Sequence, residues 1–129
     1  MKALVPYLVF PGNCKEAMKF YKNVFGGEIR IMMTFEESPI NVPDDSGSRI
    51  FNSEMVAENI TLKASDDMPG YEVESGNTIS LYVTFIDVET KIEKFNKLSE
   101  GGKVQFPIED NFGMVKDKYG IQWMVVHEE

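Results

Sequence analysis

The chain has 129 residues, 43% of them hydrophobic and 26% charged, which is enough for one buried core and too few for two ordinary domains. Its formal net charge of −8 argues against a nucleic-acid partner, because Lys and Arg side chains supply most of the affinity for phosphate backbones. An acidic surface either keeps a protein in solution or attracts cationic small molecules. We therefore expect a single globular domain, residues 1–129, with no nucleic-acid partner.

Apolar segments and cysteine content favour the cytoplasm. No segment approaches the roughly 18 apolar residues that a membrane-spanning helix needs, and residues 1–6 lack the apolar core of a signal peptide. The single cysteine, Cys14, has no partner for an internal disulfide, which suits a reducing compartment. We expect a cytoplasmic protein with no membrane partner.

The first half of the chain begins with a predicted strand and helix. Leu4 to Phe10 is typical of a short buried strand, and Asn13, with Glu16 three residues later, predicts a capped helix that ends at Gly26. One face of this helix is apolar at three- and four-residue spacing: Cys14, Ala17, Met18, Tyr21, Val24 and Phe25. That face should pack on a sheet.

Three further strands complete the first half. They are predicted at 28–35, 50–56 and 60–65, the last two joined by a hairpin at Ala57-Glu58-Asn59. In the first of them the residues that share one face are Ile29, Ile31, Met33 and Phe35. Residues 36–49 hold two prolines, one glycine and four acids, which predicts a long exposed loop, a lid or a binding segment.

The second half repeats this order of elements after a polar seam at 66–77. A strand at 78–86 alternates between a face that should meet a helix (Ile79, Leu81, Val83, Phe85) and a more polar face (Ser80, Tyr82, Thr84). Asp87 caps the next helix, which ends at Gly101-Gly102 and whose apolar stripe is Val88, Ile92, Phe95 and Leu98. Short strands follow near 104–106, 112–117 and 121–127.

Two copies of one unit are also visible in the residues themselves. Phe20 precedes Gly26-Gly27 by the interval at which Phe95 precedes Gly101-Gly102, and a strand follows each glycine pair. One unit alone would leave a sheet face uncovered. We therefore expect modules of about 1–66 and 77–129, joined by a linker at 67–76, to share one core.

Several longer motifs carry a family resemblance. They are Pro6-Tyr7-Leu8, Gly12-Asn13-Cys14-Lys15-Glu16-Ala17, Phe20-Tyr21, Phe25-Gly26-Gly27, Ala64-Ser65-Asp66, Leu98-Ser99-Glu100-Gly101-Gly102-Lys103-Val104, Phe112-Gly113 and Asp117-Lys118-Tyr119-Gly120-Ile121-Gln122-Trp123. The chain thereby resembles the vicinal-oxygen-chelate superfamily of glyoxalases, bleomycin-resistance proteins and extradiol dioxygenases. Within it, the chain is similar to the PhnB-like branch, also labelled demethylubiquinone methyltransferase-like.

The resemblance implies an α+β fold of two tandem βαβββ modules, which form a curved mixed sheet with a cup-shaped site, usually in a homodimer. Enzymes of the superfamily commonly hold a divalent metal with one ligand from each of four strands. By the resemblance, those four positions fall at Pro6, Asn52, Ser80 and Met124. Proline has no side-chain donor and methionine only a thioether, so we expect no metal and no other cofactor.

Strand alternation predicts which residues line the cup. Parity places polar and apolar groups on one face, a mixture that suits a small molecule better than an ion. The predicted ligand-binding residues are Leu8, Asn52, Glu54, Ser80, Tyr82, Gln122 and Met124. Glu54 is the candidate catalytic base or counter-charge, because burial can raise the pKa of a carboxyl. The alternative is a solvated Glu54, or one paired with Arg30 or Arg49.

The only histidine and the only cysteine are poor catalytic candidates. His127 lies two residues from the C-terminus, and its parity points it away from the cup, which favours a frayed end. Cys14 lies in the first turn of a helix, where a thiol is sometimes reactive, but a buried apolar role is the default. No Cys-His pair or Ser-His-Asp triad is well placed.

The sequence therefore leads to one main hypothesis and two alternatives. The main hypothesis is a cytoplasmic homodimer that binds an unidentified small molecule in the cup without a metal, with catalysis unproven. The alternatives are a divalent-metal lyase or dioxygenase that uses Glu54, and a protein that sequesters a cationic drug. A methyltransferase is not expected, because both glycine pairs follow helices, whereas nucleotide-binding glycines precede them.

Overall fold

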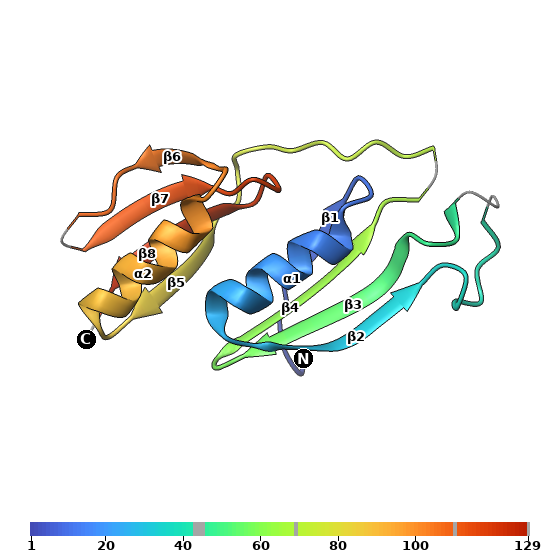
Figure 1. Ribbon diagram of the computed structural model, residues 1–129, viewed down its shortest axis with the longest axis horizontal. Coiled ribbons are helices and arrows are strands. Elements are labelled where there is room, and N and C mark those ends of the chain that lie inside the picture. Colours follow the sequence, from blue (N-terminus) through green and yellow to red (C-terminus); the bar gives the residue numbers. More distant parts are fainter. Residues whose placement is uncertain (43–45, 69, 110, 129) are drawn as a thin grey trace. The chain divides into compact units, whose positions relative to one another are not determined.

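The computed structural model describes residues 1–42, 46–68, 70–109 and 111–128. Its elements, in chain order, are β1 (Tyr7–Phe10), α1 (Cys14–Phe25), β2 (Glu28–Thr34), β3 (Ile50–Ala57), β4 (Ile60–Asp66), β5 (Leu81–Phe85), α2 (Val88–Ser99), β6 (Lys103–Phe106), β7 (Phe112–Lys116) and β8 (Gln122–His127), as Figure 1 shows. No helix in the described ranges is long and apolar enough to cross a membrane.

The chain divides into two compact units, which we call the first repeat, Met1–Val73, and the second repeat, Glu74–Glu129. Their boundary falls within the segment 67–76 that was predicted as the linker. Each repeat has one four-stranded sheet, ordered β1-β4-β3-β2 in the first and β5-β8-β7-β6 in the second. In both sheets the first strand pairs parallel with the fourth, and the other pairs are antiparallel.

The predicted α+β class and tandem βαβββ order are therefore confirmed. The expected mixed sheet consists of two four-stranded sheets, one for each repeat, and each repeat's helix lies against its own sheet (Figure 1). The common core and the cup concern how the two repeats fit together, and they stay predictions.

Three details of the predicted strands are corrected. The strand expected at 78–86 covers only Leu81–Phe85, so Ile79 precedes it and is 77% exposed instead of facing the helix. In β2 the register shifts between Ile29 and Ile31, which pair with Met55 and Glu54, and strict alternation ends at this bulge. The connection from β2 to β3 forms turns in its described part, and residues 43–45 of the predicted loop lie outside the described residues.

The β3–β4 hairpin was predicted in the right place. Ala57 pairs with Ile60, and Asn59 takes the left-handed conformation, with φ of 61°, that a tight hairpin needs.

The glycine pairs that reveal the repeat have similar but not identical roles in the two copies. Gly26 and Gly101 both have φ of 70°, the left-handed conformation that glycine adopts at little cost. Gly26 is the C-cap of α1, whereas α2 ends at Ser99 with Glu100 as its C-cap, and Gly101 lies in the turn that follows. The second glycine lies against a strand: a Cβ added at Gly27 would be 2.5 Å from the carbonyl O of Val56, and one at Gly102 would be 2.6 Å from that of Lys116. In each pair the first glycine turns the chain after the helix, and the second lets the chain pass close to the sheet.

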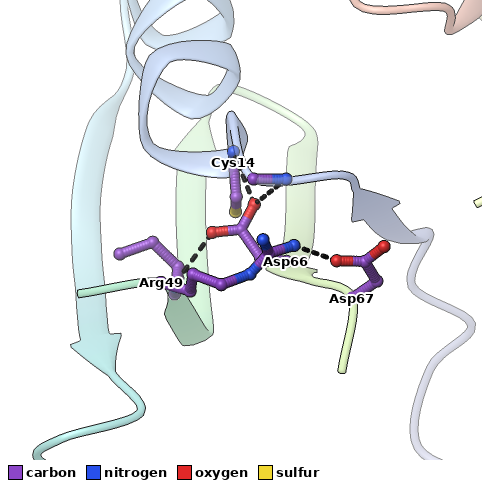
Figure 2. Close-up of polar contacts among 6 residues, drawn as sticks. Cys14, Arg49, Asp66 and Asp67 are labelled. Carbon is purple, nitrogen blue, oxygen red and sulfur yellow. Dashed lines mark hydrogen bonds and ion pairs between the residues drawn. The ribbon is translucent and has the colours of Figure 1, made fainter. Parts of the chain in front are cut away.

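A carboxylate from β4 holds the start of α1. One oxygen of Asp66, Oδ1, accepts the backbone N–H groups of Gly12 (3.0 Å) and Cys14 (2.9 Å), and Oδ2 accepts that of Ile50 (2.8 Å). Figure 2 shows this arrangement, with the ion pair between Arg49 and Asp67 beside it. The predicted cap by Asn13 is wrong, because its side chain makes no capping hydrogen bond and the buried carboxylate supplies the acceptor instead.

The thiol of Cys14 is buried beneath this cap. Its side chain is 0% exposed, and Sγ lies 3.5 Å from Oγ of Ser53 on β3. Burial raises the pKa of the Cys14 thiol to about 12; the hydrogen bond with Ser53 opposes this rise, and the nearby Asp66 charge adds a smaller one. The apolar interpretation of this cysteine is the one that its surroundings support, because a thiol with this pKa carries almost no thiolate near neutral pH.

The second helix is capped as predicted but faces the sheet differently. Asp87 accepts the backbone N–H of Thr90 at 2.8 Å, and the Thr90 hydroxyl and N–H together lower the pKa of the Asp87 carboxyl. The buried residues of α2 are Lys91, Phe95 and Leu98, whereas Val88 and Ile92 of the predicted stripe are exposed. The helix turns this way because Lys91 Nζ donates to the carbonyl O of Glu109 at 3.1 Å, which satisfies its buried ammonium.

Replacing Asp66 tests the importance of the β4 carboxylate. Asp66→Ala should lower the free energy of unfolding by at least about 3 kcal/mol, because it leaves three backbone N–H groups without their acceptor. Urea unfolding followed by circular dichroism measures the loss. Asp87→Ala is the matched control, since it removes a solvent-exposed cap, and a loss as large as that of Asp66→Ala would contradict the assignment.

The raised pKa of Cys14 predicts an inert thiol. Iodoacetamide at pH 8 should leave Cys14 unmodified in the folded protein and alkylate it fully in urea, which mass spectrometry of the intact chain measures. Because the folded pKa of about 12 exceeds the ordinary thiol pKa of 9.0, this group stabilises the fold fully below pH 9 and progressively less toward pH 12. Rapid alkylation without urea would show that the thiol is accessible.

Candidate functional site

Each repeat has one sheet face that lies opposite its helix, which we call the open face. In the first repeat, Ser53 marks the helix side, because its hydroxyl lies beside the Cys14 thiol of α1, and Ser53 pairs with Ala64. Residues that alternate with this pair belong to the open face. In the second repeat the helix side holds the buried residues Val115, Trp123 and Val125.

The open face of the first repeat carries two of the predicted site residues, Asn52 and Glu54. Both alternate with Ser53, and Glu54 pairs directly with Lys63, which pairs with Tyr7 on the next strand. Tyr7 is 52% exposed, so its ring is available at the surface. This face therefore combines an amide, an opposite-charge neighbour pair and an aromatic ring.

Leu8 does not belong to this face, so its prediction as a lining residue beside Asn52 and Glu54 is wrong. It pairs with Ala64, which is fully buried on the helix side, and its neighbour Phe10 is buried as well. The error has a physical cause. A strand of apolar residues gives no alternation signal, so only its register with β4 decides which side chains face the helix.

The two arginines proposed as alternative partners of Glu54 form ion pairs with other carboxylates. Arg30 Nε donates to Glu28 at 3.0 Å, and Arg49 forms its ion pair with Asp67. The cross-strand neighbour of Glu54 is Lys63, a residue that parity arguments did not single out. Opposite charges directly across an antiparallel pair stabilise it modestly. The observed surroundings of Glu54 are thus those of a charged sheet surface.

The open face of the second repeat brings together the other four predicted residues. Tyr82 pairs with Met124, and Met124 pairs with Met114, so these side chains form one row across three strands. Tyr82 is 57% exposed. The same register that pairs Phe10 with Asp66 pairs Phe85 with His127, which makes Tyr82 the counterpart of Tyr7.

A chain of hydrogen bonds borders this row. Gln122 Nε2 donates to Ser80 Oγ at 2.6 Å, and Gln105 Nε2 donates to Gln122 Oε1 at 2.9 Å. Gln122 is buried, so this network fixes its amide in one orientation. Sequence alternation missed Gln105, because the register of β6 shifts between Val104 and Phe106.

A hollow of about 270 Å³ lies at the connection between β6 and β7. It is lined by Phe106, Pro107, Glu109, Asn111 and Phe112. The rings of Phe106 and Phe112 have centroids 5.8 Å apart and planes inclined at 52°, and Phe106 is 56% exposed. No motif or alternation pattern predicted this hollow, and its one signal in the sequence is the proximity of two aromatic residues to a turn.

The four positions that the resemblance assigns to metal ligands have unsuitable donors. Pro6 offers only its carbonyl, which already accepts the N–H of Lys63 at 3.1 Å, and the hydroxyl of Ser80 is bonded to Gln122. Met124 offers a thioether, and Asn52 a neutral amide. Across the described ranges, no group of three or more His, Cys, Asp or Glu side chains is placed to hold a metal ion. The residues at these four positions do not fit a divalent metal.

His127 makes hydrogen bonds through both its ring and its backbone, although the sequence predicted a frayed end. It is the last residue of β8, its backbone N–H donates to Asn111, and its ring Nε2 lies 2.9 Å from the carbonyl O of Ile86. A carbonyl can only accept, so Nε2 carries the proton in this contact. The expectation of a frayed side chain is therefore wrong. The expectation that it points away from the open face agrees with its pairing to Phe85.

Known proteins resemble this chain along its whole length. A sequence model of the family described as 3-demethylubiquinone-9 3-methyltransferase matches residues 2–126. Protein PA1353 of Pseudomonas aeruginosa is 35% identical, with a TM-score of 0.90 over 99% of this chain and 98% of that one. A putative 3-demethylubiquinone-9 3-methyltransferase of Bacillus cereus, named PhnB protein, is 25% identical, with a TM-score of 0.83 over 98% and 100% of the two chains.

The fold extends to a more distant group. The fosfomycin resistance protein FosX of Listeria monocytogenes is only 9% identical, yet it has a TM-score of 0.69 over 100% of this chain and 93% of that one. This likeness shows the fold alone. Because the family model matches residues 2–126 and the PhnB protein is similar along the whole chain, the chain belongs to the PhnB-like family, described as 3-demethylubiquinone-9 3-methyltransferase, and the predicted resemblance to this branch is confirmed.

Proposed function

We propose that this protein binds a small organic molecule on the open face of its second repeat, without a metal ion. The observation that carries the proposal is the hydrogen-bonded chain of Ser80, Gln122 and Gln105 beside an apolar row. Binding sites for small molecules are mostly apolar, with a few fixed polar groups that orient the ligand. Tyr82 supplies an accessible ring, and Met124 and Met114 supply adaptable thioethers.

The fixed amide of Gln122 supports a role in orientation. Both of its polar atoms have partners, so its position does not depend on a ligand. A preorganised amide costs less entropy on binding than a mobile one. Tyr82 and the methionines would then contact the apolar body of the ligand, while exchangeable polar contacts form along the border. Cytoplasmic location and a homodimer complete the proposal, as the sequence and the resemblance suggested.

Metal-dependent lyase or dioxygenase chemistry is the less favoured function. It would need hard oxygen or imidazole donors, and the four equivalent positions carry Pro6, Asn52, Ser80 and Met124. Glu54 could contribute one carboxylate, but its register neighbour is the cation Lys63, which competes for it. No step of our proposal therefore involves a metal.

The methyl transfer named in the family description is also not proposed here. A methyl donor carrying a nucleotide needs free backbone amides or a glycine-rich turn before a helix. Asp66 accepts the N–H of Gly12, just before α1, and that of Cys14, the first residue of α1, while Asp87 accepts the N–H of Thr90 at the start of α2. In the described part of the chain, the start of each helix is thus already capped by a carboxylate.

Metal content provides the first test. We expect purified protein, prepared without chelators, to contain far less than one equivalent of zinc, nickel, manganese or iron by inductively coupled plasma mass spectrometry. Adding each ion should leave the melting temperature unchanged, because a bound metal stabilises the folded state by mass action. One equivalent of any of these metals, or a clear thermal shift, would refute metal-independent binding.

Benzamide provides the second test, because its ring suits Tyr82 and its amide suits the polar border. We expect shifts in an ¹H–¹⁵N spectrum at β5, β7 and β8, with affinity in the range of about 1 mM that is usual for a fragment. Tyr82→Ala should weaken binding at least about threefold, since stacking on an aromatic side chain contributes measurably.

Tyr7→Ala is the matched control for this titration, because Tyr7 is the counterpart of Tyr82 and is similarly exposed. It should leave the affinity unchanged. Shifts confined to the first repeat, or no shifts at all, would contradict binding at the second repeat.

A further inference from the structure

We propose that the hollow at the β6–β7 connection binds the protonated amine end of an aromatic or alicyclic ligand. The inference rests on the proposed function, because it assigns a ligand class to one end of the same open face. Phe106 pairs with Met114, and Met114 pairs with Met124, so register connects the hollow with the row that contains Tyr82. A ligand that contacts Met114 can thus extend toward Phe106.

The walls of the hollow suit a cation with an apolar body. Two phenyl rings line it, with centroids 5.8 Å apart, and Phe106 remains 56% exposed. A cation near the face of an aromatic ring is attracted by the ring quadrupole. The volume of about 270 Å³ accommodates one small ring and an ammonium group rather than a larger molecule.

The charges around the hollow favour an ammonium ion over a carboxylate. Among the described residues that line it, Glu109 is the one charged side chain, and Asn111 adds a neutral amide. Lys91 contacts the carbonyl of Glu109 but does not line the hollow, and its side chain is 1% exposed. The formal net charge of −8 attracts cations over longer distances as well.

The described residues of the connection that line the hollow are held by hydrogen bonds before any ligand arrives. Glu109 and Phe112 exchange two backbone hydrogen bonds of 3.0 and 3.3 Å. Lys91 Nζ donates to the carbonyl O of Glu109 at 3.1 Å, and the backbone N–H of His127 donates to the carbonyl O of Asn111 at 2.9 Å. The buried lysine, which the sequence placed outside the helix stripe, thereby positions the hollow. Little ordering of the chain opposes binding.

Three probes of the same size test the assignment: benzylammonium, benzyl alcohol and benzoate. We expect the full-length protein to bind benzylammonium about three- to tenfold more tightly than benzyl alcohol, because an aromatic pair and a partly exposed carboxylate each contribute modestly. Benzoate should bind most weakly. Chemical-shift titration measures all three affinities. The preference for benzylammonium should be smaller in 0.5 M than in 0.05 M salt, because the Debye length at the higher concentration is about one third as long.

Two variants test the carboxylate and the aromatic ring of the hollow separately. Glu109→Gln should remove the preference for benzylammonium, and Phe106→Leu should weaken benzylammonium and benzyl alcohol alike. Glu100→Gln is the control, an exposed carboxylate of the same repeat that does not line the hollow, and it should keep the preference. The amide spectrum of each variant establishes that it is folded.

The inference is overturned if benzyl alcohol or benzoate binds as tightly as benzylammonium, or if the preference survives in Glu109→Gln. Its failure is distinguishable from that of the proposed function. If benzamide binding depends on Tyr82 but benzylammonium binds no more tightly than benzyl alcohol, only the amine site is overturned. Absence of benzamide binding would overturn the proposed function.

Discussion

The carboxylate of Asp66 joins three segments that are far apart in the sequence. It accepts backbone N–H groups from the turn before α1, from the first turn of α1 and from the first residue of β3. A carboxylate that is bonded to several amides gains strong charge-assisted hydrogen bonds and complements the positive end of the helix. The position of α1 on its sheet depends on this contact, as does the burial of Cys14 beneath it.

The second repeat meets the same requirement with different residues. His127 takes the place of Asp66 at the end of the fourth strand, and its ring donates to the carbonyl of Ile86 in the turn before α2. Because an imidazole here donates where Asp66 accepts, the helix needs its own cap, and Asp87 provides it. The two repeats thus share one topology, but the residue at the end of the fourth strand accepts the hydrogen bonds that join sheet and helix in the first repeat and donates one in the second.

This exchange bears on where a ligand can bind. In the first repeat, a buried carboxylate occupies the helix start, and the open face carries the charged neighbours Glu54 and Lys63. In the second, buried Lys91 supports the β6–β7 connection, and the open face combines thioethers, aromatic rings and a fixed amide. Apolar surface with a few oriented polar groups suits small organic molecules, whereas exposed charge pairs stay solvated. The proposed site therefore belongs to the second repeat.

Much of the architecture was determined by local signals. The end of α1 at Gly26, the cap at Asp87 and the hairpin at Asn59 depend on backbone conformations or capping side chains that few residue types provide, so the sequence predicted them correctly. The clear alternation of Ser80, Tyr82 and Thr84 with apolar neighbours likewise placed Tyr82 on the open face. Such signals reside in adjacent residues, and they sufficed to predict the repeat and the fold class.

Tertiary structure alone decided the features that depend on residues distant in sequence. The acceptor for the start of α1 comes from β4 rather than from Asn13, and the side of β1 that Leu8 occupies follows from its pairing with Ala64. Likewise, the partner of Lys91 lies in the β6–β7 connection, and this contact accompanies the burial of Lys91 in place of Val88 and Ile92 of the predicted stripe. A sequence reports periodicity and capping within a few residues, but the register between strands and the partners of buried polar groups are set only when the chain has folded.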